Sequence, residues 1–123
     1  MKLLTTALLC LAITPTLALS AQPWEGYWTH NAAYCANAGE VGEQTPDHYS
    51  RKGFFGLEWG CDVTNLQPTG YPQSWSVTLQ CMAEGYEYNE ERLMLLSQTD
   101  RLLFLNQSGV IANMVRCADP AKR

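Results

Sequence analysis

The residues of this chain that could take part in chemistry are few, and their spacing matches no common reactive site. His30 and His48 are the only histidines in 123 residues, whereas a zinc site needs three or four ligands at recognisable spacing. No Gly-x-Ser-x-Gly element marks a hydrolase nucleophile. Four glutamates between residues 84 and 91 lie beside a turn, where acids keep a strand edge soluble. We therefore predict a protein that is not an enzyme and has no metal site and no cofactor.

Cysteine chemistry depends on the compartment, and the first 21 residues predict export. Lys2 is followed by an apolar stretch, Leu3 to Ile13, and by small residues near position 21, the pattern of a cleavable signal peptide. Exported cysteines form disulfides in an oxidising compartment. If all four cysteines that follow the signal are bonded, none remains as a thiolate nucleophile. Residues 22–123 are thus expected to carry two disulfides, built from Cys35, Cys61, Cys81 and Cys117.

Four cysteines allow three pairings, and the sequence alone leaves all three open. The preferred pairing joins Cys35 to Cys61 and Cys81 to Cys117. It would tie an irregular segment to the sheet, and the last strand back to the middle of the sheet.

The charge of the chain restricts the kinds of partner. Without Lys2, seven basic and twelve acidic residues remain, a net charge of −5. Nucleic acids and anionic lipids need clustered lysine and arginine, so neither is expected as a partner. After the signal no apolar run approaches the roughly 20 residues that cross a bilayer, so no membrane insertion is expected. We expect a monomer that binds an unknown protein or a small apolar ligand.

Two segments alternate apolar and polar residues with a period of two, which is typical of half-buried strands. In Leu57 to Thr64 the inner face carries Trp59 and Cys61, and in Trp75 to Ala83 it carries Trp75 and Cys81. The segment between them, Asn65 to Gln73, has two prolines and a glycine, which predict a loop.

The remaining segments are short and separated by turn residues. A helical turn is predicted within Asn31 to Ala38, and a loop over Gly39 to Asp47. Further strands are predicted at Trp24 to His30, Tyr49 to Phe55, Tyr86 to Ser97, Arg101 to Asn106 and Val110 to Cys117. Short strands joined by short turns predict one all-β domain over residues 22–123, an antiparallel meander of about seven strands that closes into a barrel or sandwich.

Two alternatives concern the apolar runs in the second half of the domain. Glu87 to Ser97 contains good helix formers, so a helix is the alternative to a strand there. Residues 93–96 and 102–105 are apolar on both faces of a strand. They are either buried on both sides or expose an apolar strip to a partner.

Framework residues spread over most of the mature chain resemble a pattern of small exported proteins of Gram-negative bacteria that have no assigned function. The resemblance implies a fold and a periplasmic location, with an extracellular location as the alternative. It implies no catalytic role. The residues that carry it are Gly26-x-Trp28, Cys35, Gly56-x-Glu58-x-x-Cys61, Trp75, Cys81-x-x-Glu84-Gly85 and Arg116-Cys117.

Aromatic residues are the remaining candidates for recognition. Trp59 and Trp75 lie on inner faces by periodicity, so we assign them to the core. Tyr71 lies in a loop, and Tyr86 and Tyr88 lie beside acids, so these three form the predicted binding surface. The sequence therefore predicts a non-catalytic binding or inhibitor-like module that acts through exposed loops and aromatics. The alternative is a carrier with an apolar pocket inside a small barrel.

Overall fold

The fold is seen in a computed structural model that describes Leu11 and residues 21–122. Apart from Leu11 and Ala21, the predicted export signal lies outside the described residues. The chain forms eight strands and two short 3₁₀ helices: β1 (Gly26–Thr29), η1 (Ala32–Asn37), β2 (Asp47–Tyr49), β3 (Gly53–Gly56), β4 (Trp59–Pro68), β5 (Ser74–Ala83), β6 (Tyr86–Ser97), β7 (Arg101–Asn106), β8 (Gly109–Cys117) and η2 (Pro120–Lys122).

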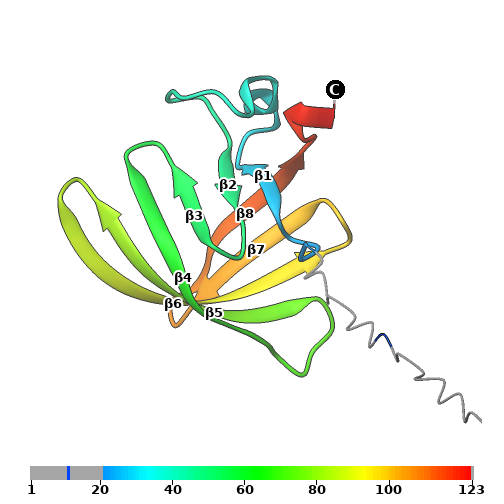
Figure 1. The fold of residues 1–123 in the computed structure, drawn as a ribbon, viewed down its shortest axis with the longest axis vertical. Helices are drawn as coiled ribbons and strands as arrows, with labels where there is room; N and C mark the ends of the chain where they lie inside the picture. The colour runs from blue at the N-terminus through cyan, green and yellow to red at the C-terminus, as the bar shows by residue number, and fades with distance from the viewer. Residues whose placement is uncertain (1–10, 12–20, 123) are drawn as a thin grey trace, which may run out of the picture.

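Each strand pairs antiparallel with the next, and β8 pairs with β1 to close a barrel (Figure 1). This confirms the predicted all-β antiparallel meander and its closure. The strand predicted over Tyr49 to Phe55 is two strands, because Ser50 begins a turn in which its backbone N–H donates to the Gly53 carbonyl at 2.9 Å. That turn raises the number of strands from about seven to eight.

The long central strands form because their apolar residues alternate, as the sequence predicts. Val77, Leu79 and Cys81 of β5 point into the barrel and are buried, while Trp59 and Trp75 are half-buried against the same core. Short side chains and rings from every strand fill this interior. Its most deeply buried large side chains are Trp24, Trp28, Phe54, Leu79, Met94, Leu102 and Phe104.

The predicted loop from Asn65 to Gln73 is shorter in the structure, because β4 continues to Pro68. A register shift between Val63 and Asn65 is followed by regular pairing with β5 as far as Pro68 opposite Trp75. Proline has no N–H to donate but is tolerated at the end of a strand. The loop is therefore confined to residues 69–73.

Glu87 to Ser97 is strand, and the helical alternative is wrong. All of β6 from Tyr86 to Leu95 pairs with β5. Met94 and Leu96 point into the core, whereas Leu93 and Leu95 face outward and are 40% and 37% exposed. The apolar runs thus leave an outer strip partly exposed instead of being buried on both sides.

Both disulfides are present, but the preferred pairing is wrong. Cys61 bonds to Cys81, and Cys35 bonds to Cys117. Cys61 and Cys81 are direct partners on β4 and β5, with Cα atoms 3.9 Å apart. Cys35 of η1 reaches the end of β8, because β8 returns to pair with β1 just before η1. One bond thus staples a hairpin, and the other joins the two ends of the domain.

Neither helix in the described part of the chain is long and apolar enough to span a bilayer.

Candidate functional site

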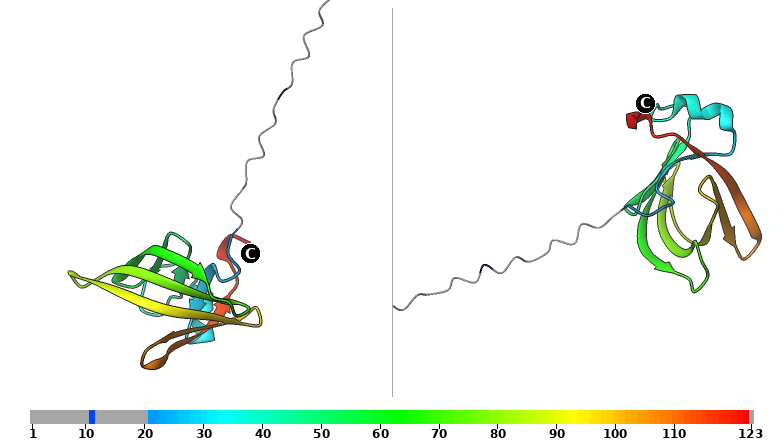
Figure 2. Two further views of the ribbon diagram at one scale, coloured as in Figure 1. Left: turned by 90° about the horizontal axis from the view of Figure 1, so that it is seen from below. Right: turned by 90° about the vertical axis from the view of Figure 1, so that its right-hand side faces the viewer.

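β8 closes the barrel along only part of its length. β8 pairs with β1 only over Val115 to Cys117, while residues 109–114 continue beside β7 alone. The first half of β8 therefore diverges from β1, as the right-hand view of Figure 2 shows, while β7 stays paired with β6 over Arg101 to Leu105. We call the opening left by this divergence the barrel mouth.

A cavity of about 600 Å³ lies at the barrel mouth. Its lining comes from β2, β4, β6 and β8 and from the residue after β1, so it depends on the whole fold. The lining residues are His30, Asp47, Tyr49, Trp59, Tyr88, Arg92, Ile111, Ala112, Asn113 and Met114. A smaller hollow of about 210 Å³ shares four of these residues and extends to Glu43 and Thr45 of the connection between β1 and β2.

Asp47 and Tyr49 form the polar floor of the cavity. They are two residues apart on β2, so both side chains lie on the same face, which is the inner one. The Tyr49 hydroxyl donates to Asp47 Oδ2 at 3.1 Å. Burial raises the pKa of Asp47 above its ordinary value, although the Tyr49 bond and the charges of His30 and Arg92 oppose the rise. Burial, and then the Asp47 charge, raise the pKa of Tyr49 well above its ordinary value, so Tyr49 is a neutral donor.

Arg92 also lines the cavity, but its charge is matched within β6. Its Nε donates to Glu90 Oε2 at 2.7 Å, and its Nη2 lies 2.5 Å from the same oxygen. Its guanidinium lies over the Phe104 ring, with Cζ 5.4 Å from the ring centroid. Arg92 and Glu90 therefore act as a paired unit that fixes one wall of the cavity.

The structure does not bring the three predicted tyrosines together. Tyr88 lines the cavity and is 38% exposed, and Tyr86 follows on the same face of β6 at the hairpin tip, 76% exposed. Tyr71 lies in the loop between β4 and β5, 82% exposed, at the other end of the ten-residue β5. Ten residues of strand span about 33 Å, so Tyr71 belongs to a different surface.

Four important residues of the site were not predicted. Asp47 was assigned to a loop and Trp59 to the core, while Glu90 and Arg92 were placed in a predicted strand without a role in a site. A signal was present for Asp47, because a period of two from the inward Tyr49 places it on the same face. No local pattern indicates that β2, β4 and β6 converge at one opening.

The two histidines lie on different faces. His48 packs on the Tyr27 ring, with centroids 4.6 Å apart, on the outer face. His30 packs on Tyr34 at 5.5 Å and borders the cavity. Within residues 21–122 no group of three histidine, cysteine or acidic side chains is placed to hold a metal ion.

Comparison with protein-family models, with curated proteins and with solved structures finds no match to this chain. The site is therefore interpreted from its own geometry. It can enclose a group that has both an apolar body, against Trp59 and Met114, and a polar part, against Asp47.

Proposed function

We propose that this chain is a non-catalytic binding module, inhibitor-like in its action, that receives a segment of a partner protein at the barrel mouth. The cavity supports this proposal because it is open to solvent and combines aromatic walls with a few polar groups, the usual composition of a binding site. Tyr86 and Tyr88 extend along the wall of the mouth on β6, so exposed aromatics are available to a partner beyond the cavity itself.

The single observation that carries the proposal is the placement of Asp47. Burial raises the pKa of Asp47, so the ionised carboxylate lowers the stability of the folded protein. A protein that makes no use of this carboxylate would gain stability by replacing it. Perturbed groups in a cleft are enriched at functional sites. Asp47 lies on the floor of a cavity of about 600 Å³, where a guest could reach it.

A small-ligand carrier is the second candidate, and the size of the cavity favours it. Small-molecule sites enclose about 300 to 1,000 Å³, and the cavity of about 600 Å³ lies within that range. The rest of the barrel interior is filled by side chains such as Phe54 and Phe104. A ligand would therefore occupy the mouth and would need a polar group as well as an apolar body.

We infer that the module acts outside the cytoplasm, with the periplasm as the first expectation. Two disulfides are compatible with an oxidising compartment. The signal-like first 21 residues and the resemblance to small exported proteins support the same location.

The test of the proposed function is to fill the cavity. Ala112 lines it from β8, whereas Val110 is two residues away on the same strand, is exposed and does not line it. Short peptides and small amphipathic fragments are titrated into ¹⁵N-labelled mature protein by NMR. Binders should shift amides around Asp47 and Tyr88. Ala112→Trp should abolish those shifts, whereas Val110→Trp should retain them.

Probes that shift the same amides equally in the wild type and in Ala112→Trp would contradict the proposal. So would shifts confined to the outer face around Phe55. Circular dichroism of both tryptophan variants confirms that they fold.

A further inference from the structure

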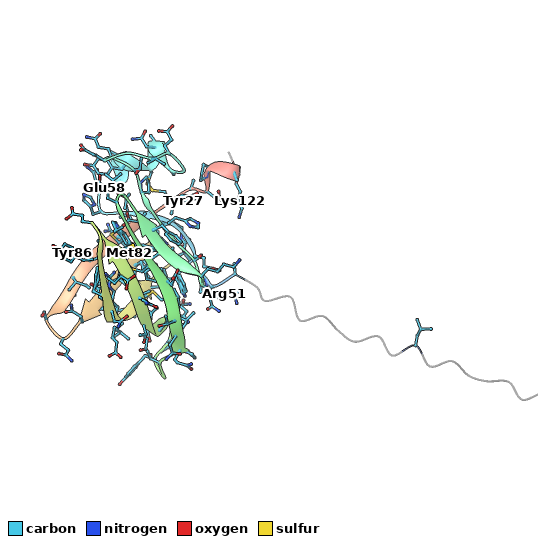
Figure 3. The ribbon with its side chains drawn as sticks, turned by 60° about the vertical axis from the view of Figure 1, so that its left-hand side comes forward. Tyr27, Arg51, Glu58, Met82, Tyr86 and Lys122 are labelled. Atoms are coloured by element: carbon cyan, nitrogen blue, oxygen red, sulfur yellow. A yellow bond between two sulfur atoms is a disulfide. The ribbon has the colours of Figure 1, made fainter. Side chains whose placement is uncertain are left out.

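Charge is unevenly distributed over the barrel, and the mouth is its acidic end. Seven of the eight glutamates of the chain lie on β6, on the turns before Trp59 and Tyr86, or on the connection between β1 and β2. They are Glu40, Glu43, Glu58, Glu84, Glu87, Glu90 and Glu91. Glu90 shares the inner face of β6 with Tyr88 and Arg92, whereas Glu87 and Glu91 lie on the opposite face. Of the lysines and arginines within 21–122, only Arg92 lines the cavity. Figure 3 shows Glu58 and Tyr86 on one side of the molecule, away from Arg51 and Lys122.

Among the described residues, Asp47 is the one acid that lines the cavity, and it forms no ion pair, although the charges of His30 and Arg92 act on it from nearby. Arg92 is engaged by Glu90 through two of its nitrogen atoms, and neither ion pair within residues 21–122 includes Asp47. Its hydrogen-bond donor, Tyr49, is neutral. The cavity therefore presents one carboxylate whose charge a guest can neutralise.

The walls of the same cavity suit a cation. Trp59 and Tyr88 both line it, and the faces of tryptophan and tyrosine rings attract ammonium and guanidinium groups. An anionic guest would find His30 and Arg92, of which Arg92 is already paired with Glu90, and would meet the negative charge of the nearby glutamates. Aromatic walls, the Asp47 carboxylate and an acidic rim all favour a positively charged guest.

We propose that the barrel mouth binds a lysine or arginine side chain of a basic partner protein, with Asp47 as its charge partner and Trp59 and Tyr88 as its aromatic walls. This inference rests on the proposed function and specifies the guest. The acidic rim favours a partner side chain over a free organic cation. Its glutamates extend over several hairpins and loops, so an extended basic surface matches them better than a single small ion does.

The test uses a pentapeptide with a central arginine, acetyl-Gly-Gly-Arg-Gly-Gly-amide, titrated into ¹⁵N-labelled mature protein at low salt. A second peptide carries citrulline, which has nearly the same shape as arginine but no charge. Free argininamide is the third probe. The protein variants are Asp47→Asn and, as a control with the same change of net charge, Asp62→Asn, because Asp62 is exposed and does not line the cavity.

The arginine peptide should shift the amides of Asp47 and Tyr88 and bind about tenfold more weakly to Asp47→Asn, since truncating one member of a charge pair is costly. Asp62→Asn should bind it as the wild type does, and citrulline should bind at least about tenfold more weakly than arginine. Equal binding of the two peptides, or equal binding by the two variants, would overturn the inference. Argininamide that binds as tightly as the peptide would overturn its assignment to a partner protein.

Failure of this inference differs from failure of the proposed function. If neutral or acidic probes bind at the mouth and Ala112→Trp blocks them, the module stands but the cationic guest is wrong. If no probe of any charge shifts the amides of the mouth, both are wrong.

Discussion

The hydroxyl of Tyr49 donates a hydrogen bond of 3.1 Å to the carboxylate of Asp47, two residues earlier on the same strand. The pair joins a polar group to the apolar core, since the Tyr49 ring packs on Phe54 and Phe104 at 4.7 and 5.3 Å. The barrel core thus fixes the position of the tyrosine, and the tyrosine fixes the carboxylate of the candidate site.

Replacing Tyr49 by Phe should destabilise the fold while leaving the core intact. The ring contacts remain, but the Asp47 carboxylate loses its donor. A buried acceptor without its partner costs about 1 to 3 kcal/mol. Urea unfolding at neutral pH measures the loss. Wild-type stability in Tyr49→Phe would show that the bond contributes nothing.

Replacing Asp47 by Asn should raise the stability of the free protein at neutral pH. Burial raises the pKa of Asp47 in the folded state, against the smaller effects of Tyr49, His30 and Arg92. The folded state therefore holds this proton more tightly than the unfolded state, and ionisation of Asp47 above its folded pKa costs stability. As the pH falls through that pKa, the wild type regains this stability.

The stability gained by Asp47→Asn over the wild type should thus be present at pH 7 and become smaller as the pH falls. Urea unfolding of wild type and variant at pH 7 and pH 4 measures it, with Asp62→Asn at the exposed position as control. His30→Gln, combined with both proteins, separates the contribution of the neighbouring histidine. A variant that is less stable than wild type at pH 7 would contradict this prediction.

The two disulfides should contribute unequally. The chain-entropy model gives about 3 kcal/mol for the 20-residue separation of Cys61 and Cys81, and about 4.5 kcal/mol for the 82-residue separation of Cys35 and Cys117. The paired alanine variants should follow this order in urea unfolding. Peptide mapping without reduction checks the connectivity, and a Cys35 to Cys61 fragment would refute it.

Replacing Arg116 by lysine should destabilise the fold. Its Nε donates to the Thr99 carbonyl at 2.7 Å and its Nη1 to the Glu25 carbonyl at 3.0 Å, while its Cζ lies 4.3 Å from the centroid of the Trp28 ring. Lysine lacks the planar fork that makes these contacts together. Arg116→Lys should lose about 1 to 3 kcal/mol, measured by urea unfolding, and the amides of β1 should exchange faster. Arg101→Lys, at an exposed position, is the control and should match the wild type.

Gly53 should not tolerate a methyl group. A Cβ there would lie 2.6 Å from the Phe55 ring and 2.7 Å from the Cys61 carbonyl oxygen. The ring could move, but the carbonyl belongs to the paired backbone of β4. Gly53→Ala should lose about 1 to 3 kcal/mol by overpacking, even when Phe55 is also replaced by alanine.

Gly70→Ala is the matched control, because a Cβ at Gly70 meets nothing within 4 Å. It should change the free energy of unfolding by less than about 0.5 kcal/mol. If Gly53→Ala and Gly70→Ala unfold at the same temperature, the crowding at Gly53 does not destabilise the fold.

Periodicity was sufficient to predict the two central strands, because burial of one face of a sheet imposes a period of two on the sequence that forms it. It places Cys61 and Cys81 correctly on inner faces. Which cysteines lie opposite each other depends on the register of neighbouring strands, and that register depends on the length of the turns between them. The loop predicted over residues 65–73 is confined to residues 69–73 in the structure. The preferred disulfide pairing was wrong for this reason.

The candidate site depends on the closure of the whole barrel. Asp47 and Trp59 lie on β2 and β4, which are not neighbours in the sheet. β6 brings Tyr88 and Arg92 to them because β8 turns back to β1 and leaves the mouth open. Tyr88 was predicted as a surface residue from its acidic neighbours. Its role in a cavity wall becomes visible only when strands that are not adjacent in sequence meet.

The most direct test of the binding site is a crystal structure of the mature protein with the arginine pentapeptide. We predict an arginine guanidinium within hydrogen-bond distance of the Asp47 carboxylate, beside Trp59 and Tyr88. A peptide ordered elsewhere on the barrel, with the mouth left unoccupied at saturating peptide, would contradict the account.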